Sequence, residues 1–164
     1  MTVESTIDKD ARTVTFVATF DASPDRIWQV WEDARQLERW WGPPTWPASF
    51  PQHEFRVGGE SKYYMTGPEG DKAHGWMRWE ELDEPNAIRF VDGFGDTDGN
   101  PDPSLPITSS VVTFAGTDGG TTMTIAGTFE SIEDLEKVVA MGFQEGMSLA
   151  LGQIEDVLAS SISR

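Results

Sequence analysis

Three side chains with recognisable chemistry alternate along one predicted strand, namely His74, Trp76 and Arg78. Successive residues of a strand point to opposite faces, so these three share one side. The other side of the same strand carries small and apolar residues, which are Gly75, Met77 and Trp79. If the first set faces a cavity, Arg78 could bind a carboxylate and Trp76 could stack on an aromatic ligand. If the second set does, that wall is apolar and Arg78 is solvated, an alternative that the acidic neighbours Glu80 and Glu81 favour.

Other spacings that suggest chemistry fail on inspection. The segment 96–102 resembles the start of a calcium loop, but Pro101 replaces the required glycine and Ile107 stands where the closing glutamate belongs. The segment 146–150 departs from a serine-hydrolase elbow at one position and lies inside a predicted helix. The chain has no cysteine, two distant histidines and no glycine-rich phosphate loop. We therefore predict no metal site and no cofactor.

The length and charge of the chain argue against several classes of protein. Its 164 residues suit one domain, which we place over residues 1–164 with a core over about 11–159. The protein is strongly acidic, with a net charge of −16 and scattered basic residues, which argues against nucleic acid and anionic lipid as partners. The opening residues have neither a basic region nor an apolar run, and no stretch approaches the roughly 18 apolar residues of a membrane span. We therefore expect no signal peptide, no membrane insertion and a cytoplasmic location.

A long amphipathic helix predicted over residues 131–158 has glycines where bulky inward-facing side chains are expected. Its inward stripe runs through Ile132, Leu135, Val139, Gly142, Gly146, Ala150, Gln153 and Val157. A glycine inside a helix costs roughly 1 kcal/mol relative to alanine. Gly142 and Gly146 thus indicate either close packing of another backbone or space for a ligand, and the small middle of the stripe favours a cavity. Gln153 is a candidate polar contact for that ligand, although a buried amide more often satisfies a backbone group.

The remaining elements are predicted from alternation and turn residues. Strands are expected over 12–20, 49–55, 60–66, 74–82, 87–94, 108–115 and 121–129, with two short helices after the first strand, one starting at Ser23-Pro24 and one over 35–41. This order predicts an α+β fold, in which a curved antiparallel sheet surrounds the long C-terminal helix. Such a sheet leaves a hollow beneath the helix, where ligands tend to bind.

Charged residues indicate which face of two predicted strands points inward. If Lys62 and Arg89 point outward, then Tyr63 and Met65 on one strand and Phe90 on another face the helix. In the second short helix, Trp40 and Trp41 are adjacent and point about 100° apart. We therefore expect one of these indoles in the core and the other at the rim of the pocket.

Several short motifs, taken in order, resemble one protein family over about residues 11–159. They are Ala22-Ser-Pro-Asp-Arg-Ile-Trp28, Leu37-Glu-Arg-Trp-Trp-Gly-Pro43, Arg56-Val-Gly-Gly59, a strand from Gly75 to Asp83-Glu-Pro85, Thr121-Thr-Met-Thr-Ile125, Ser131-Ile-Glu-Asp-Leu135 and Met141-Gly-Phe-Gln-Glu-Gly-Met147. This series is similar to the activators of heat-shock protein 90 ATPase homologues, a branch of the START-like (SRPBCC) superfamily. The resemblance implies the helix-grip fold, with a deep cavity between the C-terminal helix and the sheet. Relatives bind lipids, sterols, polyketides or other hydrophobic molecules, and a few catalyse cyclisation or hydrolysis there.

The favoured interpretation is non-enzymatic binding of a small hydrophobic or aromatic molecule in that cavity. The candidate ligand-binding residues are Trp40, Trp41, Tyr63, Met65, Trp76, Arg78, Phe90, Gly142, Gly146 and Gln153. One alternative is a cyclase or hydrolase that uses Arg78, His74, Tyr63 or Glu145, which requires at least two of these to converge inside the cavity. The other is a module that binds a chaperone, although the eponymous co-chaperone has a further domain that this chain is too short to hold. The resemblance implies a monomer or a homodimer.

Overall fold

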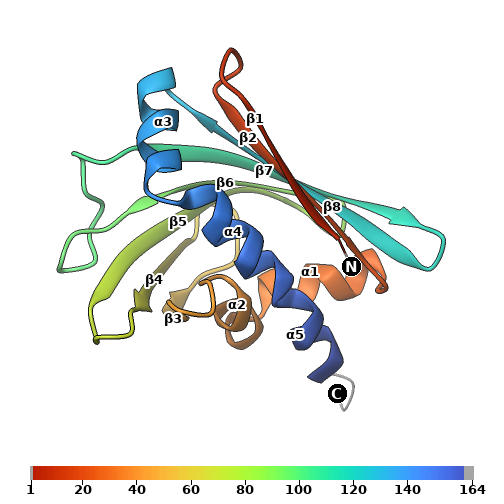
Figure 1. The fold of residues 1–164 in the computed structure, drawn as a ribbon. Coiled ribbons are helices and arrows are strands. Elements are labelled where there is room, and N and C mark those ends of the chain that lie inside the picture. Colours follow the sequence, from red (N-terminus) through yellow and green to blue (C-terminus); the bar gives the residue numbers. More distant parts are fainter. Residues whose placement is uncertain (1, 161–164) are drawn as a thin grey trace.

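Eight strands form one antiparallel sheet in the computed structural model, which describes residues 2–160. The strands are β1 (Val3–Asp8), β2 (Thr13–Phe20), β3 (Ala48–His53), β4 (Glu60–Thr66), β5 (Lys72–Asp83), β6 (Ala87–Phe94), β7 (Ile107–Thr117) and β8 (Gly120–Phe129). Their order across the sheet is β1-β2-β8-β7-β6-β5-β4-β3. The sheet curves around the C-terminal helices, as Figure 1 shows. The predicted α+β helix-grip architecture is confirmed.

Five helices accompany the sheet in the described part of the chain. They are α1 (Pro24–Glu32), α2 (Ala34–Trp40), α3 (Ile132–Ala140), α4 (Phe143–Gly152) and α5 (Ile154–Ser160). Ser23 caps α1 by accepting a hydrogen bond from the Arg26 backbone N–H at 3.3 Å, and Pro24 suits the first turn because it needs no donor there. Ser131 caps α3 in the same way through the Asp134 N–H at 3.0 Å. No helix among residues 2–160 is long and apolar enough to cross a membrane.

The C-terminal helical segment is long, as predicted, but it is not continuous. Gly142 has a φ of +88°, which no residue inside a right-handed α-helix adopts, and it separates α3 from α4. Glycine tolerates this left-handed conformation because it lacks a Cβ. The axes of α3 and α4 consequently point in different directions in Figure 1. Gly142 therefore sets the direction of α4 and is not a gap in the side of a straight helix.

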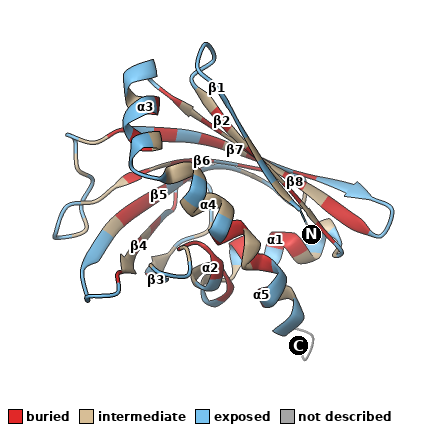
Figure 2. Ribbon diagram, viewed as in Figure 1, coloured by how far each residue is buried: buried red, intermediate tan, exposed pale blue. Residues whose placement is uncertain are grey.

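The helices cover only part of the inner face of the sheet. α3 packs on β8, α4 packs on β1, β2 and α2, and α5 packs on α2. Buried residues gather between these layers in Figure 2. The largest fully buried side chains include Trp28, Trp31, Trp40 and Trp79, which fill the end of the sheet near α1 and α2. The other part of the inner face, over β4, β5 and β6, is thus left less crowded.

Strand β1 is the main feature that the sequence did not predict. It pairs with β2, from Val3 opposite Ala18 to Asp8 opposite Thr13. Its residues are mostly exposed, and the pattern lacks the alternation of apolar residues that marks β2. An edge strand with few buried side chains carries little signal in its sequence.

Candidate functional site

A cavity of about 470 Å³ lies between the C-terminal helices and the sheet. The helix side is formed by Val138, Met141, Gly142, Phe143, Gly146 and Met147. The sheet side is formed by Tyr63, Met65, Ala73, Asp92, Gly93, Phe94 and Thr108, and the segment after α2 adds Trp41, Pro43 and Trp46. Small-molecule sites commonly have volumes of about 300–1,000 Å³ and largely apolar walls. The size and lining of this cavity are therefore those of a site for a small organic molecule.

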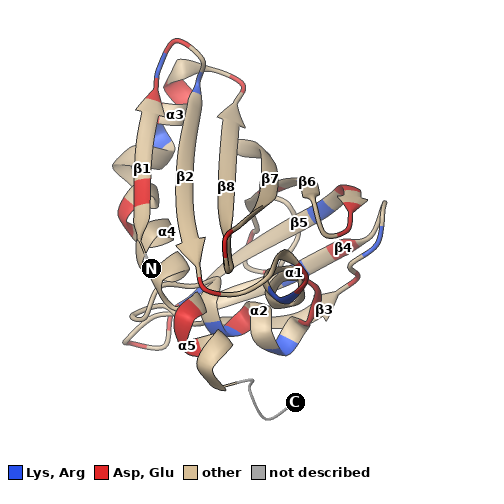
Figure 3. Ribbon diagram, turned by 90° about the vertical axis from the view of Figure 1, so that its right-hand side faces the viewer, with Lys and Arg blue, Asp and Glu red and all other residues tan. Residues whose placement is uncertain are grey.

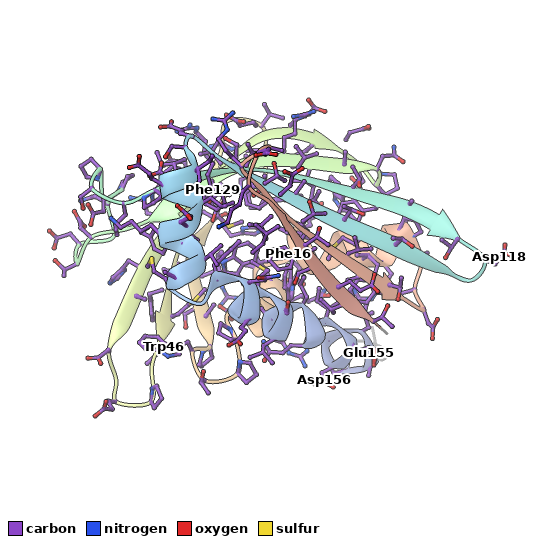
Figure 4. All side chains as sticks on the ribbon, turned by 45° about the horizontal axis from the view of Figure 1, so that its top comes forward. Phe16, Trp46, Asp118, Phe129, Glu155 and Asp156 are labelled. Carbon is purple, nitrogen blue, oxygen red and sulfur yellow. The ribbon has the colours of Figure 1, made fainter. Side chains whose placement is uncertain are left out.

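Gly146 keeps the helix side of the cavity open. A Cβ placed on Gly146 would have no neighbouring atom within 4 Å, so the space below α4 is not filled by another residue. Nearby Phe143 packs edge-on against Phe16 and Phe129, with ring centroids 5.6 and 6.3 Å away. In Figure 4, Phe16 and Trp46 lie on opposite sides of α4. The helix thus packs toward β2 and β8, and the cavity lies on its other side.

Tyr63 crosses the floor of the cavity because the neighbouring strand carries a glycine. Tyr63 on β4 pairs with Gly75 on β5, and a Cβ on Gly75 would collide with the ring and hydroxyl of Tyr63. The ring stacks on Phe50 at 4.9 Å and meets Trp41 edge-on at 6.1 Å. The hydroxyl therefore reaches over β5 toward β6. Burial and the nearby Asp92 raise the pKa of Tyr63, so this phenol stays protonated.

Asp92 is an acid in an otherwise apolar wall. It lies on β6 between Met77 of β5 and Thr108 of β7, and it faces the cavity. Burial raises the pKa of Asp92 to about 7, because the charged form loses its hydration. No hydrogen bond or ion pair to its carboxyl group is formed within residues 2–160. At neutral pH this side chain exists in part as the neutral carboxylic acid, which can donate a hydrogen bond.

The Trp41 ring forms part of the wall of the same cavity. Its Nε1–H is buried and has no hydrogen-bond partner among the described residues. The adjacent Trp40 lies in the core, where its Nε1–H donates to the Val30 carbonyl at 2.9 Å. The Trp28 indole N–H is also unpaired, but that ring is enclosed by the edges of Phe55 and Phe114 and does not line the cavity. Trp41 is therefore the one of these two indoles whose ring lines the cavity.

The structure places half of the sequence-predicted site residues at the cavity. Trp41, Tyr63, Met65, Gly142 and Gly146 line it. Trp40 and Phe90 belong to the core instead, and Phe90 packs against Trp31, Trp41 and Trp79.

Gln153 has a structural contact in place of a ligand contact. Its Nε2 donates to the Gly42 carbonyl at 2.6 Å and to the Trp40 carbonyl at 3.4 Å. This bond ties the end of α4 to the segment after α2. It is the backbone-satisfying alternative that the sequence left open for a buried amide.

Trp76 and Arg78 face away from the cavity, on the outer side of β5. Trp76 covers Gly93 of the neighbouring strand, and the Arg78 guanidinium lies 5.9 Å from the centre of the Trp76 ring. Arg78 is exposed. The inner side of β5 carries Gly75, Met77 and Trp79, so the apolar alternative for this strand is the correct one. The reason is register, since Tyr63 faces inward and its pairing with Gly75 places the odd-numbered residues of β5 inward with it.

The residues considered for acid–base catalysis do not converge. Of Arg78, His74, Tyr63 and Glu145, only Tyr63 lines the cavity. His74 lies beside Tyr64, with ring centroids 5.9 Å apart, and Glu145 is exposed on α4. Residues 2–160 contain no group of three or more His, Asp or Glu side chains that could bind a metal ion. Lys and Arg are scattered over the view in Figure 3 and form no basic cluster there.

The sequence analysis missed Asp92, although its signal was present. The predicted strand 87–94 has Ile88 and Phe90 on its inward side, and a period of two extends that side to Asp92 and Phe94. Because a lone acid on an inward face is unusual, it could have been noted as a candidate polar contact.

Known proteins resemble this chain over most of its length. The model of the family described as "Activator of Hsp90 ATPase homolog 1-like protein" matches residues 21–159. A protein from Arthrobacter aurescens, solved by solution NMR, is 48% identical with a TM-score of 0.92, over 96% of this chain and 91% of that chain. The crystal structure of a Mycobacterium smegmatis protein is 45% identical with a TM-score of 0.89, over 96% and 97% of the two chains. A Rhodobacter sphaeroides protein, 22% identical over 97% and 99%, shares the fold with a TM-score of 0.82. Curated proteins offer no match to this sequence.

Proposed function

We propose that this chain, which belongs to the Activator of Hsp90 ATPase homolog 1-like protein family, binds a small, largely apolar or aromatic molecule in the cavity between its C-terminal helices and its sheet. The START-like fold of this family is of a ligand-binding type. Binding here requires no cofactor and no covalent chemistry. The ligand would leave water and enter a cavity whose walls are mainly aromatic rings, methionines and small residues.

The open space below Gly146 is the observation that carries this proposal. A helix gains roughly 1 kcal/mol when an interior glycine is replaced by alanine, and nothing in the structure prevents that replacement at Gly146. Gly142 has a separate reason to be glycine, namely its left-handed backbone. A glycine with no conformational or packing reason, facing an apolar cavity, is consistent with room kept for a guest.

The alternatives have weaker support in the geometry. A cyclase or hydrolase based on Arg78, His74 or Glu145 lacks its reacting groups in the cavity. Capture of a chaperone by this protein in a pull-down would support a chaperone-binding module instead.

Native mass spectrometry and thermal-shift assays with fatty acids, sterols and aromatic compounds test the proposal. A ligand at about 100 times its Kd stabilises the protein by about 2.7 kcal/mol, which for a chain of this size raises the Tm by roughly 5–10 °C. The cavity is blocked by Gly146→Trp, and Leu149→Trp is the matched control because Leu149 is 58% exposed on the same helix.

We expect Gly146→Trp to melt cooperatively and to show no ligand-induced shift, while Leu149→Trp responds like the wild type. Silence of the wild type across the whole panel, or full binding by a folded Gly146→Trp variant, would contradict the proposal.

A further inference from the structure

One end of the cavity has polar groups that the protein itself leaves unpaired. We call Trp41, Tyr63 and Asp92 the polar end, because all three line the cavity and Tyr63 lies beside the other two. Leaving a buried donor unpaired costs about 1–3 kcal/mol, so proteins rarely do it without a reason. The rest of the lining offers the Thr108 hydroxyl and the Trp46 indole N–H as further polar side-chain groups.

The groups at the polar end are mainly hydrogen-bond donors. An indole N–H can only donate, and the Trp41 N–H has no acceptor within residues 2–160. The phenol of Tyr63 stays protonated, because burial and the adjacent acid raise its pKa. The neighbouring Trp41 N–H partly offsets that rise, but it forms no hydrogen bond of normal geometry with the phenol.

Within residues 2–160, no Lys, Arg or His lines the cavity that Asp92 faces. Its strand neighbours are Met77 of β5 and Thr108 of β7, Tyr63 of β4 lies nearby, and Val138 of α3 and Gly146 of α4 line the same cavity. Tyr63 is the only other titratable residue that lines the cavity. A carboxylate without a counter-ion in an apolar site takes up a proton more readily, and the neutral acid then becomes a donor.

We propose that the ligand is a neutral ketone, ester or amide whose carbonyl oxygen accepts hydrogen bonds from the Tyr63 hydroxyl and the Asp92 carboxyl group of the polar end. This inference rests on the proposed function, since it names the chemical class that the same cavity binds. A hydrocarbon would leave the donors unpaired, and a carboxylate would bring a second negative charge toward Asp92. An amine could pair with Asp92, but once protonated it would offer the Tyr63 hydroxyl no acceptor.

Four naphthalenes of one substitution pattern separate these classes. An acetylnaphthalene carries the carbonyl, and the isopropenylnaphthalene replaces its oxygen by a methylene group of similar shape. The corresponding naphthylethylamine and naphthoic acid carry a positive and a negative charge. Binding is measured by isothermal titration calorimetry at pH 5.5 and pH 8.5, with the wild type, Asp92→Asn and Asp92→Leu. Asp118→Leu serves as the control, because Asp118 lies at the distant tip of the β7–β8 turn in Figure 4.

We expect the ketone to bind at least as tightly as the alkene, although its carbonyl makes it the less hydrophobic of the two. Removal of the acid in Asp92→Leu should lower the ketone-to-alkene affinity ratio about 10-fold, which corresponds to the loss of one good hydrogen bond. The wild-type ratio should also fall as the pH rises past 7, because a carboxylate cannot donate. In Asp92→Asn it should be independent of pH, since the amide keeps an N–H donor at both values. The Asp118→Leu ratios should match those of the wild type.

Each contrary result has a distinct meaning. If ketone and alkene both bind, but their ratio is the same in Asp92→Leu and at both pH values, the cavity is functional and the carbonyl inference is wrong. Preferred binding of the amine overturns it too, because Asp92 then recognises a cation. If none of the four compounds binds, while Gly146→Trp and the wild type respond identically to the broader ligand panel, the proposed function itself fails.

Discussion

Two groups of polar side chains lie on the inner face of the sheet, and they differ in whether the protein satisfies them. The first group, which we call the closed network, consists of His53, Ser61 and Trp79 beneath the end of α1. The second is the polar end of the cavity. Each contains an indole N–H, a hydroxyl and a titratable group, so the two can be compared group by group.

In the closed network every polar side-chain atom has a partner. The Trp79 Nε1–H donates to the Ser61 Oγ at 2.9 Å, and the Ser61 hydroxyl lies 2.7 Å from the His53 Nδ1. The His53 Nε2 faces the carbonyls of Trp31 and Glu32, both at 3.0 Å, so it must carry the proton. With His53 neutral, Ser61 can donate to its Nδ1 and each donor has an acceptor. Burial lowers the pKa of His53 and favours this neutral form.

The polar end has the same kinds of group without the same closure. Within residues 2–160, the Trp41 N–H has no acceptor and the Asp92 carboxyl group has no partner. Trp79 and His53, on the same side of the sheet, both have hydrogen-bond partners. The fold can therefore complete a buried hydrogen-bond network in the filled core, although the Trp28 indole N–H there is unpaired as well. The groups whose partners we assign to a ligand are those at the cavity, Tyr63 and Asp92.

The largest expected effect on stability comes from replacing Asp92 at the polar end. Its pKa in the folded protein is raised to about 7 from 3.8, so the folded state holds the proton more tightly than the unfolded state. This contribution to stability is complete below pH 3.8 and is lost as the pH rises through about 7. Replacement by Asn removes the ionisation, so Asp92→Asn should be more stable than the wild type at pH 9, by up to about 4 kcal/mol. Urea unfolding at pH 5 and pH 9 measures this, with Asp118→Asn as the control. Equal stability of wild type and Asp92→Asn at pH 9 would mean that the carboxylate is well solvated.

The next effect compares one hydroxyl from each group. Ser61 is fully buried, and its removal leaves the Trp79 N–H without an acceptor and the His53 Nδ1 without a donor. We expect Ser61→Ala to lower the free energy of unfolding by about 2–3 kcal/mol. For Tyr63→Phe we expect less than about 1 kcal/mol, because no protein group loses a hydrogen-bond partner. Denaturant unfolding of both variants at pH 7 tests this difference, and similar losses would show that the polar end is internally satisfied.

A smaller effect concerns the closed network and the direction in which the free energy of unfolding changes with pH. Because the pKa of His53 is lowered in the folded state, the unfolded chain binds a proton there first as the pH falls below about 6.5. The closed network therefore loses stability between pH 7 and pH 5.5, whereas Asp92 contributes a gain over the same range. We expect Asp92→Asn to unmask the loss, as a free energy of unfolding that declines on acidification, and His53→Gln to flatten it. Unfolding of the single and double variants at closely spaced pH values would reveal this. If the free energy of unfolding of Asp92→Asn does not change between pH 7 and pH 5.5, the neighbours of His53 must accommodate its protonated form.

The sequence predicted the sheet and the short helices well, because alternation and turn residues are local signals. The α+β class, seven of the strands and the inward direction of Tyr63 and Met65 all follow from such patterns. The break at Gly142 could not be separated from a cavity-forming glycine, since both produce the same residue on the same stripe. Trp40 and Trp41 are equally ambiguous, because only the packed core decides which indole finds a carbonyl.

The polar end was the hardest part to predict, because its chemistry depends on what is missing. No pattern in the sequence states that the Trp41 N–H lacks an acceptor or that Asp92 lacks a cation. Those facts arise because the end of α2, β4 and β6, which are distant in the chain, meet at the cavity. The closed network is similar in this respect, since residues 53, 61 and 79 meet only through the pairing of β3, β4 and β5.

The smallest effect separates the two glycines that the sequence could not tell apart. Gly146 has helical neighbours and open space beside it, so Gly146→Ala should raise the free energy of unfolding by about 0.5–1 kcal/mol. Gly142 has a φ of +88°, and Gly142→Ala should lower it by about 1–2 kcal/mol, although a methyl group would meet no atom within 4 Å there either. Opposite signs in chemical denaturation would show that Gly142 is needed for the backbone and that Gly146 is retained at a cost in stability. If Gly146→Ala were also destabilising, α4 would depend on a close approach at that site, and the cavity would not explain the glycine. If Gly146→Ala still binds a ligand and Gly146→Trp does not, the bound ligand leaves room for a methyl group below α4 but not for an indole.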